Sequence, residues 1–99
     1  MPLFAIRRDV GPMTQEDVDA AGLRATICAA AFTGLRWKRS YWNPELGEIR
    51  CYYEARSAKD IEEHSLRSAI PCDEIFEVRE LLPDAYAAVA ADAVPATVR

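Results

Sequence analysis

The segment from residue 48 to residue 64 most constrains the fold, because a strand pattern passes into a helix pattern within a few residues. Residues 48–55 alternate as a half-buried strand does, and one face of that strand would carry Ile49, Cys51, Tyr53 and Ala55. Ser57 then begins a motif resembling a capping box, with Asp60 at the third helical position, which predicts a helix start. In this helix His64 shares a face with Ile61, because residues three apart on a helix are neighbours. We therefore expect the single histidine of the chain to point towards that face of the strand.

The rest of the chain supplies further strand and helix patterns. Strand patterns span residues 2–10, 35–42 and 74–82, and further helix patterns begin at Thr14 and Pro83. The helix after Thr14 should run for about five turns to a stop at Gly34, and Pro71 should end the following helix. Turn formers at 43–47 should join two strands as a hairpin. The order β-α-β-β-α-β plus a helix predicts an α+β, ferredoxin-like two-layer sandwich over residues 1–83, a C-terminal helix at 84–94 and a flexible tail at 95–99.

Alternation also predicts which face of the sheet each strand residue occupies. In the strand at 35–42 we place Trp37, Arg39 and Tyr41 towards the helices, and in the last strand Phe76 and Val78. The other face then mixes aromatic residues with charges of both signs: Arg7, Lys38, Arg50, Glu54, Glu77 and Arg79. Because exposed apolar patches usually mark interfaces, we expect a homodimer through this open sheet face.

Length, charge and cysteine spacing exclude several classes of function. With 99 residues the chain forms one domain, too short for a separate lobe that binds a nucleotide cofactor. A net charge of −4 disfavours a nucleic-acid partner, although basic and aromatic residues interleave at 36–42 as on RNA-binding sheets. No apolar run could span a bilayer and no secretory signal is seen, so we expect a cytoplasmic protein without a membrane partner. The three cysteines lack zinc-site spacing and should be reduced thiols.

The candidate site consists of five residues: Trp37, Tyr41, Cys51, Tyr53 and His64. If the strand faces are right, three aromatic residues lie beside the thiol and the imidazole and leave room for a small-molecule pocket between sheet and helices. The histidine could ligate a metal, act as a general acid or base, or be hydrogen-bonded core filling, and all three readings stay open. Cys51 by itself is more often a buried small residue, and becomes a candidate nucleophile if it lies within hydrogen-bonding reach of His64.

Four segments also stand out together: WKRSY at 37–41, IRCYYEA at 49–55, IEEH at 61–64 and IPCDEI at 70–75. They resemble a family of small actinobacterial proteins that is best known from a nickel-binding, nickel-responsive member. The resemblance covers about residues 1–82 and implies a ferredoxin-like fold, a homodimer and a divalent metal, nickel or another. His64 and Cys51 coincide with the recurring histidine and cysteine of that family, and Tyr41 with its tyrosine. With one imidazole per chain, a nickel site here would need Cys, carboxylates or a second subunit to complete it.

Three functions from different classes remain open. The first is a dimeric protein that binds a divalent metal through His64 and Cys51, or a small ligand against Trp37, Tyr41 and Tyr53. The second is a cofactor-independent isomerase, cyclase or lyase-like enzyme with His64 as general acid or base, assisted by Tyr41 or Cys51. The third is a non-catalytic partner-binding module. The sequence does not decide whether the chain is an enzyme.

Overall fold

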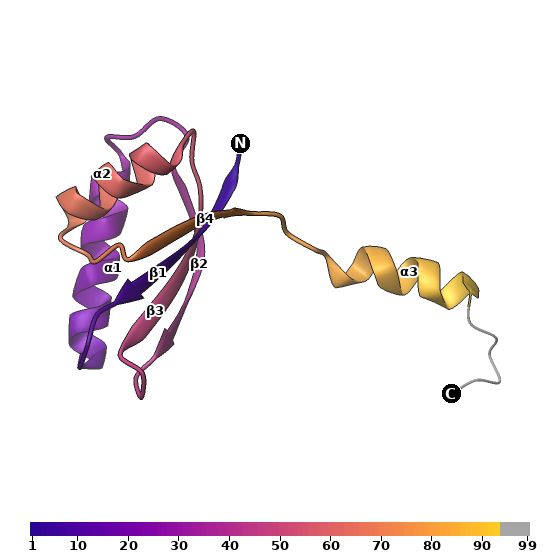
Figure 1. The fold of residues 1–99 in the computed structure, drawn as a ribbon, viewed down its shortest axis with the longest axis horizontal. Helices are drawn as coiled ribbons and strands as arrows, with labels where there is room; N and C mark the ends of the chain where they lie inside the picture. Colours follow the sequence, from indigo (N-terminus) through magenta and orange to yellow (C-terminus); the bar gives the residue numbers. More distant parts are fainter. Residues whose placement is uncertain (94–99) are drawn as a thin grey trace.

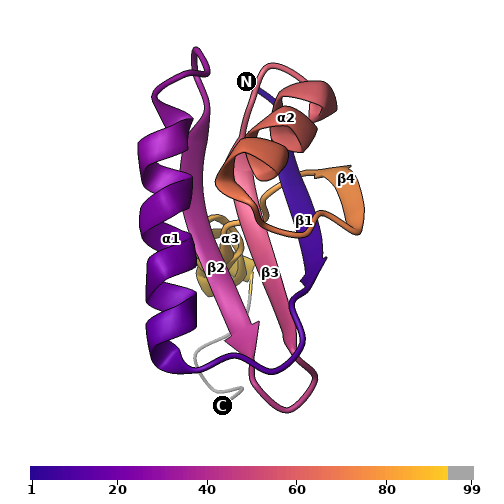
Figure 2. The same cartoon turned by 90° about the vertical axis from the view of Figure 1, so that its left-hand side faces the viewer.

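The order of strands and helices is the one expected for a ferredoxin-like fold. A computed structural model describes residues 1–93 of the chain. Its elements are β1 (Leu3–Asp9), α1 (Gln15–Ala29), β2 (Arg36–Asn43), β3 (Glu48–Glu54), α2 (Ala58–Ser68), β4 (Glu74–Val78) and α3 (Pro83–Ala93). The strands form one antiparallel sheet in the order β2-β3-β1-β4, and α1 and α2 cover one of its faces (Figure 1, Figure 2). The predicted α+β ferredoxin-like fold is therefore confirmed. The tail predicted at 95–99 lies outside the described residues.

Side-chain caps set where the two sheet-covering helices begin. Thr14 accepts a hydrogen bond from the Asp17 N–H at 3.1 Å, and the Asp17 carboxylate accepts one from the Thr14 N–H at 3.0 Å, and together these two bonds form a capping box. Ser57 caps α2 by accepting from the Asp60 N–H at 3.3 Å. Helix α1 ends at Ala29, before the predicted glycine stop, so it is shorter than five turns.

The structure corrects the faces predicted for β2. Trp37 pairs with Tyr53 on β3, but Lys38 is then left out of the ladder, which makes a β-bulge. A shift of one residue exchanges the faces of all following side chains. Ser40 and Trp42 therefore point towards the helices. The placement of Tyr41 towards the helices is wrong, because it lies on the open face, where its ring meets that of Tyr52 edge to face.

The faces predicted for β4 also need correction. In β1, Ile6 is buried beneath the helices, and Ile75 is its neighbour in β4. Ile75 consequently packs against the core, whereas Phe76 and Val78 lie on the open face. Both faces of this short edge strand carry apolar side chains, so alternation alone does not show which face is the inner one.

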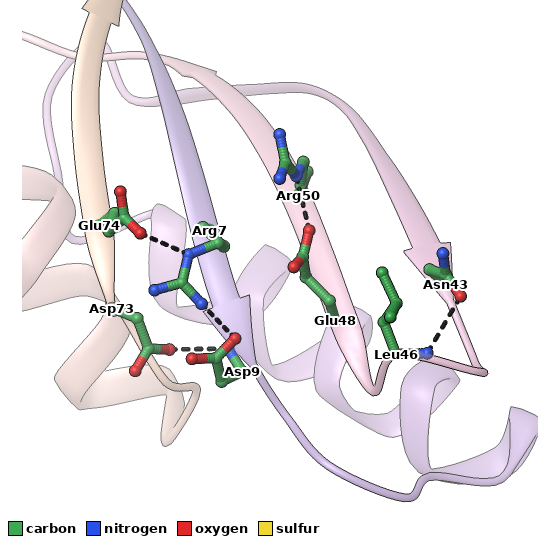
Figure 3. Close-up of polar contacts among 8 residues, drawn as sticks. All are labelled: Arg7, Asp9, Asn43, Leu46, Glu48, Arg50, Asp73 and Glu74. Atoms are coloured by element: carbon green, nitrogen blue, oxygen red, sulfur yellow. Dashed lines mark hydrogen bonds and ion pairs between the residues drawn. The ribbon is translucent and has the colours of Figure 1, made fainter.

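The open face of the sheet carries ion pairs formed within the single chain. Arg7 pairs with Asp9 and, at 2.7 Å, with Glu74, while Arg50 pairs with Glu48 at 2.6 Å (Figure 3). These bonds raise the pKa of the Arg7 guanidinium. Several charges that the sequence assigned to a dimer contact are thus already paired in the monomer. Exposed ion pairs contribute little free energy each, so they do not prevent such a contact.

Helix α3 follows β4 through a short linker and projects away from the sheet (Figure 1). None of its residues is buried, and its side chains Tyr86 and Val89 are exposed. Across residues 1–93, no helix combines the length and hydrophobicity needed to span a membrane.

Candidate functional site

A cavity of about 200 Å³ lies between the sheet and α1, and we call it the sheet–helix cavity. The α1 side of the cavity carries the small residues Ala21, Gly22 and Ala25, and the sheet side carries the aromatic residues Trp37, Trp42 and Tyr53. Because the helix residues are small, the aromatic side chains of β2 and β3 do not fill the gap between the two layers. The cavity therefore results from the pairing of small and large residues that the sequence places on the two layers.

The aromatic part of the cavity is held by stacking and one hydrogen bond. The Trp37 and Tyr53 rings are nearly parallel, at 11°, with their centroids 6.3 Å apart. The Trp37 indole N–H donates to the Ser40 hydroxyl at 2.8 Å, which orients the ring. Trp37 remains 45% exposed although it lines the cavity, so it lies between the cavity and solvent. A flat apolar surface is thus available to a molecule that enters.

Arg8 contributes the charged group of the cavity lining. Its side chain is only 1% exposed. Its Nε donates to the Cys51 thiol at 3.2 Å, and its Nη1 donates to the Ser65 hydroxyl at 2.9 Å and to the Pro71 carbonyl at 2.8 Å. These bonds join β1 to β3, to α2 and to the segment after α2. Sequence reasoning missed Arg8, although its position two residues after the buried Ile6 places it on the covered face.

His64 is fully buried at 0% exposure and faces the sheet, as predicted. Its Nε2 donates to the Ala25 carbonyl at 2.8 Å, which ties α2 to α1, and its ring packs edge-on to Phe32 and against Tyr53. Burial lowers the pKa of the imidazole, and the nearby Arg8 charge lowers it further, whereas the bond to Ala25 opposes the shift. The ring is therefore neutral near pH 7, with its proton on Nε2. Its Nδ1 is buried and has no partner among residues 1–93.

The five predicted site residues do not form one cluster. Three of them, Trp37, Cys51 and Tyr53, line the sheet–helix cavity. His64 packs against the Tyr53 ring but is not part of the cavity lining. Cys51 is hydrogen-bonded to Arg8, while the polar neighbours of His64 are the Ala25 carbonyl and the Ser68 hydroxyl. Tyr41, 62% exposed, lies on the other side of the sheet.

The fold and the cavity define a small ferredoxin-like α+β protein with a ligand-sized space between its two layers. A family model described as nickel responsive protein SCO4226-like matches residues 4–78, and the chain belongs to this family. The crystal structure of SCO4226 from Streptomyces coelicolor A3(2) is similar with a TM-score of 0.73 at 21% sequence identity, over 81% of this chain and 99% of that one. At this identity the likeness concerns the fold. A comparison with curated proteins gives no match.

The described residues do not fit a nickel ion held by one chain. Within residues 1–93, no group of three or more His, Cys, Asp or Glu side chains is arranged to hold a metal. His64 has only Nδ1 free, because Nε2 is bonded to Ala25, and Cys51 is already in contact with Arg8. Nickel sites need several such donors at once. The two predicted metal ligands are therefore not sufficient by themselves.

Proposed function

We propose that the protein binds a small, mainly apolar organic molecule in the sheet–helix cavity. The supporting observation is the cavity itself, about 200 Å³ in volume, with aromatic walls, a partly exposed Trp37 and few polar groups. Binding sites for small molecules usually combine apolar walls with a small number of polar groups in this way. A cytoplasmic location stays a prediction.

A second hollow, of about 270 Å³, lies on the open face of the sheet. Two of its three basic residues are already paired, Lys38 with Glu54 and Arg39 with Glu80, and the third is Arg79. It falls on the surface that we assign to a second copy of the chain, so we do not place the ligand there.

Filling the cavity from α1 should abolish binding. In a Gly22→Leu variant the new side chain would enter the sheet–helix cavity, because a Cβ at this position lies 3.5 Å from the Trp37 ring. The helix should persist, since leucine favours a helix over glycine by about 0.5–1 kcal/mol. A thermal-shift screen of small aromatic and branched aliphatic compounds, followed by tryptophan fluorescence titration, should give hits for the wild type that weaken at least tenfold in the variant.

The matched control for this experiment is Gly22→Ala, which adds a single methyl group at ordinary contact distance from Trp37. It should keep binding and gain a few tenths of a kcal/mol or more in stability. Hits that bind Gly22→Leu as tightly as the wild type would show that the ligand site is elsewhere.

Nickel is the alternative ligand that the family description favours, and nickel chloride belongs in the same screen. If nickel raises the melting temperature of both the wild type and Gly22→Leu, the ligand is a metal ion bound outside the sheet–helix cavity. Its site would then need further donors besides His64 and Cys51. An enzyme that uses His64 as general acid or base is less favoured, because the ring does not line the cavity. A partner-binding module would use the open sheet face.

We also propose that the open sheet face pairs with the same face of a second copy. This face exposes Tyr41 and Phe76 beside charges of both signs, which suits a self-complementary two-fold contact. Phe76→Glu should weaken the dimer at least tenfold, because it introduces two like charges, one from each subunit, into the contact. Light scattering coupled to size-exclusion chromatography measures the mass. The control is Leu66→Glu, which introduces the same charge at an exposed position of α2, away from the open sheet face. A wild type that stays monomeric at high concentration would refute the pairing.

A further inference from the structure

Arg8 holds a buried positive charge for which the described residues supply no counter-ion. Its side chain is 1% exposed and forms no ion pair with any other residue in the range 1–93. The groups that accept its hydrogen bonds are a thiol, a hydroxyl and a backbone carbonyl, on Cys51, Ser65 and Pro71. Placing an ion in a protein interior costs several kcal/mol, and a nearby opposite charge is the usual compensation. The charge of Arg8 is therefore unexplained by the fold alone.

Arg8 lines the sheet–helix cavity, and its guanidinium carbon lies 6.0 Å from the centre of the Tyr53 ring, which lines the same cavity, so a molecule bound there can reach the charge. The described hydrogen bonds occupy Nε and Nη1, which leaves Nη2 as the donor available to a ligand. Trp42 also lines the cavity, and its Nε1 is a buried donor without a partner among the described residues. No Asp or Glu belongs to the lining. The cavity thus combines a fixed cation and a free donor with no anion of its own.

We propose, resting on the ligand cavity proposed above, that the ligand is a small monocarboxylate. Its carboxylate accepts a hydrogen bond from Arg8 and supplies the missing negative charge, with the Trp42 indole N–H as a second donor. Its aromatic or branched aliphatic part packs against Trp37 and Tyr53. The ligand is thereby bound at one end by charge and at the other by apolar contact.

The charge and the walls of the cavity restrict the ligand further. One guanidinium balances one negative charge, whereas a dianion such as phosphate would leave excess charge between apolar walls. Because three hydrogen bonds already fix Arg8, little side-chain entropy is lost when the ligand binds. The remaining lining includes Val18, Ala25 and Ile49, which favours an apolar body over a polar one.

The test compares acids with their uncharged amides on the wild-type protein. Calorimetric titrations with benzoate and benzamide, and with phenylacetate and phenylacetamide, should show the acid binding at least tenfold more tightly than its amide. Inorganic phosphate should not raise the melting temperature at the concentration at which benzoate does. Arg8→Met should remove the preference for the acid while the amide keeps its affinity. This comparison in the wild type decides the matter even if the variant does not fold, and Arg8→Lys, which keeps the charge, should retain a preference for the acid.

The outcomes separate this inference from the proposed function. If acid and amide bind equally and Gly22→Leu removes both, the cavity binds ligands but the carboxylate assignment is wrong. If phosphate binds as tightly as benzoate, the restriction to monocarboxylates is wrong. If neither the acids, the amides nor any compound of the wider screen binds the wild type, both the inference and the proposed function fail.

Discussion

The His64→Ala variant is expected to lose about 2–5 kcal/mol of unfolding free energy, as large-to-small changes in a protein core usually do. The ring is fully buried between Phe32 and Tyr53, so alanine would leave a cavity there. The change also removes the hydrogen bond from Nε2 to the Ala25 carbonyl, which joins α2 to α1. Urea denaturation followed by circular dichroism measures the difference. A variant as stable as the wild type would show that His64 is not a core residue and would favour a metal-binding or catalytic role.

The same residue should give the stability an acidic pH dependence. Burial lowers the pKa of His64 in the folded state below its ordinary value of 6.5, so the unfolded chain takes up the proton first as the pH falls. The stability that the folded protein has with His64 neutral is fully present above about pH 6.5. It is lost as the pH falls from there towards the folded-state pKa, because protonation favours the unfolded chain. His64→Gln keeps a donor for Ala25 but cannot titrate. A plot of the free energy of unfolding against pH should therefore slope less steeply in the variant than in the wild type within this window.

The features predicted correctly from the sequence depend on residues close together in the chain. The capping box at Thr14 and the N-cap at Ser57 fix where helices begin, because the capping atoms lie within three residues of each other. The direction of His64 follows from the helical period, once the cap sets the start of α2. The order of elements then leaves few topologies, and the ferredoxin-like sandwich is one of them.

The features that were missed depend on contacts between distant segments. The bulge at Lys38 appears only when β2 is paired with β3, and it is the bulge that moves Tyr41 to the open face. Arg8 was assigned to neither face, although the alternation of β1 puts it under the helices. A charged residue in a core is rarely expected, and its acceptors on β3, α2 and the following segment come together only in the folded chain. The group that we propose to bind the ligand was therefore the hardest to predict.

Raising the pH should destabilise the protein through Tyr53. Its phenol is buried, and burial raises its pKa from 10.0 to about 12, helped by Cys51 and opposed by Arg8. Above pH 10 the unfolded chain loses the phenol proton while the folded protein keeps it, so deprotonation favours unfolding. The stability contribution is complete below pH 10 and is lost as the pH rises towards 12. A shift of this size corresponds to about 2–3 kcal/mol at the end of that window.

Tyr53→Phe isolates this effect, because it keeps the ring that stacks on Trp37 and removes the titrating group. The free energy of unfolding is measured by urea denaturation at pH 9 to 12. Over this range it should fall by about 2–3 kcal/mol more in the wild type than in the variant. Tyr41→Phe removes an exposed phenol from the open face and should keep the wild-type slope. Parallel curves for wild type and Tyr53→Phe would mean that water reaches the Tyr53 hydroxyl freely. The sheet–helix cavity would then be filled with water. The apolar part of the proposed ligand would have no water-free surface to pack against.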